Sequence, residues 1–151
     1  MSTRANVIIT ETNVWNNETH TESLVFYRHS DGYPENTMPV LELFLKWVKA
    51  GHIRDNISQS AGWLVIIGAI EYNTIPGFII EHGLGSYGDL ESIETPKDWK
   101  VGAFEPTVGI HGDIQYLYVV DLARKVIDVY DNRQDFDRIG NKLLGHKIES
   151  I

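Results

Sequence analysis

The chain has 151 residues, 42% of them apolar, which is typical of one domain built around a single hydrophobic core. It contains no cysteine, which excludes disulfides, thiolate zinc sites and thiol catalysis and leaves His, Asp and Glu as metal ligands. The formal charge of −8 at pH 7 disfavours direct binding to nucleic acid, because an acidic surface repels phosphate backbones. We therefore expect a single domain, residues 1–151.

The start of the sequence lacks the apolar core of a signal peptide. The longest apolar run, residues 61–70, is too short to cross a bilayer core of about 30 Å. These two features predict a cytoplasmic protein that has no contact with a membrane.

The first two predicted elements are strands over residues 7–12 and 24–29, both rich in β-branched and aromatic side chains. The polar stretch between them contains Asn16 and Asn17, which tolerate a positive φ in a turn. The two strands are therefore predicted to pair as an antiparallel hairpin. Side chains at alternate positions of the second strand point to opposite faces.

Two helices are predicted next. Thr37 is the predicted cap of a helix that ends before Gly51 and carries apolar side chains at helical spacing. A second helix is expected from a cap at Asp55 or Asn56 to about residue 72. Residues 61–70 are apolar on every side and partly β-branched, so the pattern also allows a buried strand there.

The remaining sequence divides into an irregular part and a β-rich part. Residues 74–100 are dense in Gly, Pro and acidic residues, which predicts a long irregular stretch, a candidate lid or partner surface. A short strand at 101–104, a hairpin formed by 114–120 and 126–130, and a closing helix over 134–144 follow. The expected fold is α+β, with an antiparallel sheet of four or five strands and two or three helices packed on one face.

Two short motifs, His29-Ser30-Asp31 and His111-Gly112-Asp113, each hold a histidine and an aspartate two residues apart. In an extended chain these side chains share one face, so each pair can direct an imidazole and a carboxylate to one point. If the two strand ends are neighbours, the groups converge. The predicted ligand-binding residues are Arg4, Arg28, His29, Asp31, Tyr33, His111 and Asp113.

Two other interpretations of these residues stay open. The aspartates are ordinary turn residues, and Arg28 can simply pair with Glu35 or Asp31. Alternatively, a metal-assisted hydrolase would use His29, Asp31, His111 and Asp113 to hold the ion, with Glu105 as a further acid or base. No phosphate-binding loop or serine nucleophile motif is present.

Residues 1–7, together with 27–34, resemble a group of small uncharacterised proteins found largely in tailed bacteriophages and prophages. Those proteins begin with a Thr-Arg dipeptide and an apolar strand, and later carry an aromatic or cysteine, a histidine and Asp-Gly-Tyr-Pro. This chain departs at Ser30, where the group often has tryptophan. The resemblance covers about the first 35 residues and implies a phage origin, hence the host cytoplasm, without implying a reaction.

From these features we expect a phage accessory protein without a cofactor that acts in host takeover or counter-defence. It would bind a small anionic ligand or a host protein and would not be an enzyme. An alternative is an acidic inhibitor of a host nucleic-acid-binding enzyme, with residues 74–100 as its contact. An exposed edge strand could also pair two copies into a homodimer.

Overall fold

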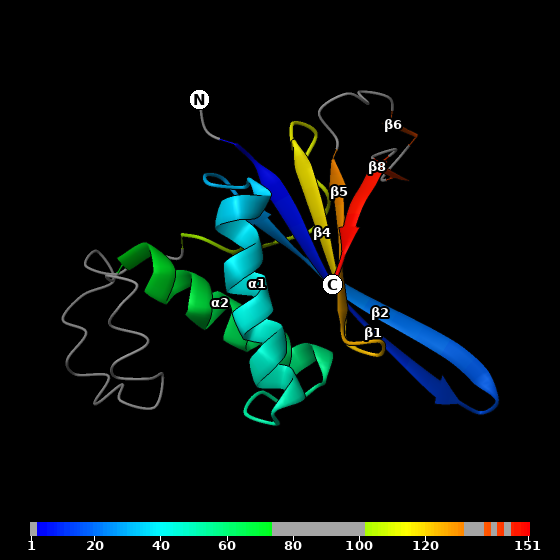
Figure 1. Cartoon of the computed structure of the whole chain (residues 1–151). Coiled ribbons are helices and arrows are strands. Elements are labelled where there is room, and N and C mark those ends of the chain that lie inside the picture. Colours follow the sequence, from blue (N-terminus) through cyan, green and yellow to red (C-terminus); the bar gives the residue numbers. More distant parts are fainter. Residues whose placement is uncertain (1–2, 74–101, 132–137, 140–141, 144–145) are drawn as a thin grey trace.

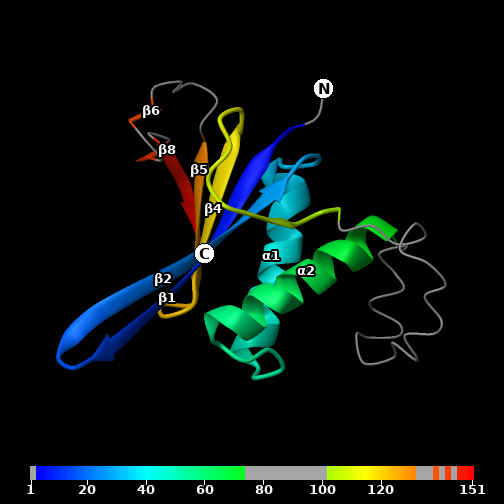
Figure 2. The same ribbon diagram turned by 180° about the vertical axis from the view of Figure 1, so that it is seen from behind.

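The computed structural model describes residues 3–73, 102–131, 138–139, 142–143 and 146–151 (Figures 1 and 2). The predicted irregular stretch at 74–100 lies outside these residues. Two ranges that were expected to form part of a closing helix are instead short strands, β6 (Arg138–Ile139) and β7 (Lys142–Leu143). They pair antiparallel in a small second sheet, so a helix over the whole of 134–144 is wrong.

The main sheet has six strands in the order β3-β2-β1-β4-β5-β8. Their bounds are Glu105–Thr107 for β3, Glu18–Arg28 for β2, Ala5–Trp15 for β1, Tyr116–Asp121 for β4, Val126–Asp131 for β5 and His146–Ser150 for β8. The predicted α+β class is confirmed, and the sheet is mostly antiparallel. It has more strands than the four or five expected, and the pairing of β1 with β4 is parallel.

Two strand predictions need correction in detail. The short strand expected at 101–104 is found just after it, as β3, and pairs with the outer edge of β2. The chain then has to pass from β3, at one edge of the sheet, to β4 on the far side of β1. Strand β3 is antiparallel to β2 and therefore runs in the same direction as β1. Because the connection crosses over the sheet, β4 can run in that direction too, and it pairs with β1 in parallel.

Both predicted helices are present and lie on the same face of the sheet (Figures 1 and 2). Helix α1 (Pro34–Lys49) begins one turn earlier than predicted, because Pro34 is well suited to the first helical position. The predicted cap, Thr37, lies inside the helix, and Tyr33 is the N-cap. Helix α2 (Ile57–Asn73) shows that residues 61–70 are helical and not a strand. The Asn56 side chain accepts a hydrogen bond from the Gln59 amide at 2.9 Å and so caps this helix.

Within the described residues, no helix has both the length and the apolar character needed to span a membrane. Helix α2 is nevertheless mostly apolar, and one of its apolar side chains, Ile66, is exposed to solvent.

The hydrophobic core lies between the helices and one face of the sheet. Alternate side chains of β1, Ala5, Val7 and Ile9, point into it and are fully buried. The helix side chains that face β1 recur at helical spacing. The buried face of the sheet and the buried faces of the helices therefore pack into one core. The helical contribution to the core comprises Met38, Leu41, Phe44, Leu45, Val48, Ile57, Ala61, Leu64 and Ile67.

Gly68 of α2 allows the fully buried Phe104 to pack against the helix. A Cβ at residue 68 would lie 2.8 Å from Phe104 Cδ2 and 2.9 Å from the Phe104 backbone nitrogen. We expect Gly68→Ala to lower the free energy of unfolding by about 1–3 kcal/mol, because the backbone of Phe104 cannot move aside cheaply. Chemical denaturation measures this change.

Gly62 provides a matched control in the same helix. A Cβ there would meet nothing within 4 Å, so Gly62→Ala should raise the free energy of unfolding by up to about 1 kcal/mol through helix propensity. Equal effects of the two substitutions would show that Phe104 does not pack against Gly68 in solution.

Candidate functional site

Tyr27 is the centre of a group of polar side chains on the sheet face that the helices leave uncovered. The register pairs Tyr27 with Asn6, whereas the neighbouring pair, Phe26 and Val7, points into the core. Four further residues, from the start of the chain, the end of β2 and the connection before β4, contact Tyr27 or one another. We call Arg4, Tyr27, His29, His111 and Asp113 the Tyr27 cluster.

Asn6 holds the connection between β3 and β4 against this face. Its side-chain nitrogen donates to the Phe26 carbonyl oxygen at 2.9 Å, and its side-chain oxygen accepts from the His111 amide at 2.8 Å. The side chain is fully buried, and these two backbone groups satisfy both of its polar ends, as a buried amide requires. Asn6 thereby fixes the backbone of His111 on the sheet face opposite the helices.

His111 stacks on Tyr27 as a result of this placement. The two ring centroids are 3.9 Å apart and the ring planes differ by 11°. The His111 ring also approaches the Thr107 hydroxyl, with 3.2 Å between Nε2 and Oγ1. The ring is therefore oriented by contacts on its face and on its edge.

His29 contacts the other end of Tyr27. The Tyr27 hydroxyl and His29 Nδ1 are 3.0 Å apart, a hydrogen-bond distance, and the imidazole is exposed. Because residues 27 and 29 are two apart on an extended chain, they share this face. The two histidines that the sequence singled out thus both contact Tyr27, which the predicted residue set did not include.

Arg4 and Asp113 form an ion pair at the border of the cluster, with 3.2 Å between Nη1 and Oδ2. The side chains are 36% and 56% exposed, so water screens the pair and its contribution to stability is small. Backbone contacts also position Arg4, since its amide donates to the Gln115 side chain at 2.6 Å.

The environment of Tyr27 disfavours its ionised form. Burial and then the Asp113 carboxylate raise the pKa of Tyr27 above its ordinary value of 10.0, while the Arg4 guanidinium lowers it. We expect Asp113→Asn to lower the pKa of Tyr27, since one source of negative charge is removed. The tyrosinate absorbance of each protein, compared with its Tyr27→Phe counterpart, measures this pKa. Asp31→Asn is the matched control and should leave it unchanged, and an unchanged pKa in Asp113→Asn would contradict the arrangement described.

Arg28 does not belong to the site, although the sequence placed it there. It lies on the core side of β2, 1% exposed, and forms a bidentate ion pair with Glu71 of α2 at 3.1 and 2.5 Å. Its Nε donates to the backbone carbonyl of Asp31 at 3.1 Å, and its guanidinium lies 5.0 Å from the centre of the Phe104 ring. The physical reason is strand alternation, which directs residue 28 away from residues 27 and 29.

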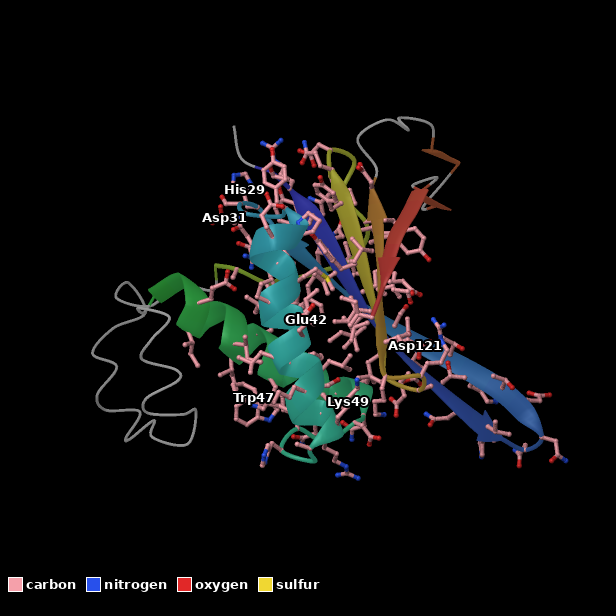
Figure 3. The ribbon with its side chains drawn as sticks, viewed as in Figure 1. His29, Asp31, Glu42, Trp47, Lys49 and Asp121 are labelled. Atoms are coloured by element: carbon pink, nitrogen blue, oxygen red, sulfur yellow. The ribbon has the colours of Figure 1, made fainter. Side chains whose placement is uncertain are left out.

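Asp31 and Tyr33 lie near the cluster without joining its contacts. Asp31 has a positive φ of 58°, and its backbone carbonyl accepts from the Thr37 hydroxyl at 2.9 Å. Figure 3 shows His29 and Asp31 together at the end of the molecule where α1 begins. The Tyr33 ring instead approaches Tyr116, with 5.9 Å between centroids, on the helix side of the sheet.

The described residues contain no group of three or more histidine and acidic side chains placed to share a metal ion. The predicted metal site of His29, Asp31, His111 and Asp113 is therefore not formed. The contacts above explain why, because His29 and His111 flank Tyr27 and Asp113 pairs with Arg4. Glu105, the predicted further acid, lies opposite Tyr27 in β3.

Comparison with known proteins gives no assignment, since no family model, no curated protein and no solved structure matches this chain. The residues that sequence reasoning missed are Asn6, Tyr27 and Glu71. One signal existed for Asn6, because an asparagine inside an otherwise β-branched strand is unusual. For the Tyr27 cluster as a whole, only the positions of the strand ends in space could have shown that its side chains converge.

Proposed function

We infer that this chain is a phage accessory protein that binds a host protein, and that the Tyr27 cluster is part of the contact surface. The observation that carries this inference is the state of the two guanidinium groups expected to hold an anion. Arg28 is buried against Glu71, and Arg4 is paired with Asp113. A small anion would have to displace the carboxylate that each arginine already binds. A protein surface can instead contact the Arg4–Asp113 ion pair without breaking it.

The composition of the surface also supports a protein partner. Tyrosine and arginine are enriched at protein interfaces, where they combine a large contact area with hydrogen bonding. Val108, in the connection that His111 anchors, is fully exposed and adds an apolar contact next to the cluster. One cavity lies between α2 and strands β2 and β3 and another lies on α2, and Tyr27 lines neither of these two.

The resemblance to phage proteins involves the same end of the molecule. Of the residues that carry it, His29, Ser30, Asp31 and Tyr33 are exposed. Exposed residues on a loop held by a rigid sheet are common in binding surfaces, whereas core residues mainly serve packing. The phage origin itself rests on the sequence resemblance.

A two-part experiment tests the proposed function. Inorganic phosphate and nucleotides should leave the melting temperature unchanged, because no anion site stabilises the folded state by mass action. In a lysate of the bacterial host, the immobilised protein should retain a partner that the double variant His29→Ala with Val108→Ser loses. The matched control, Glu42→Ala with Ile151→Ser, changes an exposed polar residue and an exposed apolar residue elsewhere and should retain it. A phosphate-dependent rise in melting temperature that Arg4→Gln abolishes would instead favour the small-ligand alternative.

A further inference from the structure

The β1–β2 hairpin extends well beyond the rest of the sheet. Pairing of β1 with β4 ends at Thr10, so residues 11–23 pair only with each other among the described residues and form a two-stranded arm. Figures 1 and 2 show this arm projecting away from the body of the molecule. Its turn has a positive φ at both Asn16 and Asn17, the requirement of a tight turn whose twist matches the strands.

The arm carries three glutamates, two exposed apolar side chains and no lysine or arginine. Its histidine, His20, lies 5.2 Å from the Trp15 ring centre and 3.8 Å from the Glu18 carboxylate. Val14 and Trp15 near its tip are 77% and 66% exposed. The register places Trp15 opposite Glu18 and Glu11 opposite Glu22, all on the face that continues the core side of β1. Two like charges directly opposite each other are unfavourable, and a two-stranded ribbon alone is marginally stable, so the arm is suited to a covering partner.

A surface of opposite charge lies on the same chain, at the end of α1 and in the loop to α2. We call its exposed residues, Lys46, Lys49, His52 and Arg54, the basic end. Within the part of the chain that the structure describes, no ion pair involves any of these four. Figure 3 shows Lys49 at the lower end of α1, the end of the molecule from which the arm also projects.

An open groove lined by both polar and apolar side chains adjoins the basic end on the outer face of α2. It has a volume of about 280 Å³ and is lined by Ser58, Gln59, Gly62, Trp63 and Ile66. Ile66 is 41% exposed, a large value for an apolar residue in the middle of a helix. The groove can hold the indole at the tip of the arm. The basic end can face the carboxylates along the arm.

We propose that two copies of the chain pair by exchanging arms, with Trp15 of each copy in the groove of the other and Glu18 and Glu22 facing its basic end. The root of the arm lies beside this surface, because the Glu11 carboxylate accepts a hydrogen bond from the Ile57 amide at 3.0 Å. Two arms related by a twofold axis can therefore run antiparallel, each tip reaching the start of the other α2. The four residue steps from Glu11 to Trp15 span about 13 Å.

Local charge complementarity identifies a second copy of the chain as the partner whose arm binds the groove and the basic end. Two chains of formal charge −8 repel each other overall, so pairing requires that a cationic surface meet the acidic arm. This inference is independent of host-protein binding, because the arm and the Tyr27 cluster lie at opposite ends of β1 and β2.

Light scattering after gel filtration, over a concentration series, measures the association. The wild-type protein should approach twice the chain mass of 17.2 kDa. Trp15→Ala should weaken the dimer about tenfold or more. The charge-reversed arm, Glu18→Lys with Glu22→Lys, and the charge-reversed basic end, Lys49→Glu with Arg54→Glu, should each remain single chains.

An equimolar mixture of the two charge-reversed proteins should return to the two-chain mass, because the reversed surfaces again complement each other. Glu35→Lys, at the other end of α1, is the matched control and should leave the dimer intact. Melting curves verify that each variant is folded. A wild-type protein that stays at one chain mass, folded variants that stay dimeric, or a mixture that fails to pair would each overturn the proposal.

Discussion

Arg28→Ala should lower the free energy of unfolding by about 3 kcal/mol, the largest effect expected from any single residue of the predicted site. The substitution removes one partner of a buried ion pair, which typically costs about 3–5 kcal/mol. We expect the lower end of this range because Glu71, 26% exposed, can regain some contact with water. The Nε hydrogen bond to Asp31 and the contact with the Phe104 ring are lost as well.

Urea denaturation of Arg28→Ala and His29→Ala measures the contrast between the two adjacent residues. His29 is exposed, so its replacement should change stability by no more than about 0.5 kcal/mol. Glu71→Gln separates charge from packing, since the amide can still accept from the guanidinium, and should cost less than Arg28→Ala. Equal stability of the Arg28→Ala and His29→Ala proteins would show that the Arg28–Glu71 pair does not form in solution.

The second large effect is expected from Asn6→Ala, with a loss of about 2–3 kcal/mol. Asn6 is buried and satisfies the Phe26 carbonyl and the His111 amide, and a buried polar group left without a partner costs about 1–3 kcal/mol. The connection behind the sheet loses its anchor at the same time. We therefore expect the stacking of His111 on Tyr27 to weaken along with the stability.

Denaturation and the NMR signals of the His111 ring together measure the Asn6→Ala effect. The ring protons of His111 should shift away from the values that a face-to-face tyrosine imposes. Thr12→Ala is the matched control on the same face of β1, where only an exposed hydroxyl contact of 3.2 Å with Thr21 is lost, and it should leave both readouts nearly unchanged. Unaltered His111 signals in folded Asn6→Ala would contradict the anchoring role.

Local patterns were sufficient for the first three elements of the chain, β1, β2 and α1. Alternation of side chains and two asparagines in the turn predicted the β1–β2 hairpin, and helical spacing predicted α1. The ambiguity at 61–70 could not be resolved from the sequence, because an apolar run without periodicity fits a buried strand as well as a buried helix. Glu11, which accepts from the Ile57 amide, is a tertiary contact that favours the helix and that no local pattern reveals.

The candidate site was predicted in part. The sequence predicted convergence of His29 and His111 only on the condition that the two strand ends are neighbours. The structure places each imidazole against Tyr27. Arg28 was assigned to the wrong face, even though the alternation of the strand already separated it from His29. Its partner Glu71 could not have been found from the sequence, because it lies 43 residues away on a different element.

The parallel pairing of β1 with β4 was likewise beyond local reasoning. Strong hairpin signals at both ends of the chain favour a wholly antiparallel sheet. The pairing depends on where the connection after β3 crosses the sheet. The Asn6 side chain contacts this connection by accepting a hydrogen bond from the His111 amide at 2.8 Å, a contact between residues 105 apart that no local pattern reveals.

Photo-crosslinking in infected or lysogenic host cells tests the central claim, that the Tyr27 cluster contacts a host protein. A benzophenone amino acid at position 29 should give a discrete adduct with one host protein, and the adduct should decrease when Val108→Ser is added. The same group at position 42, exposed on α1 and on the opposite side of the sheet, should give no such adduct (Figure 3). No adduct from position 29, or the same adduct from position 42, would contradict the account.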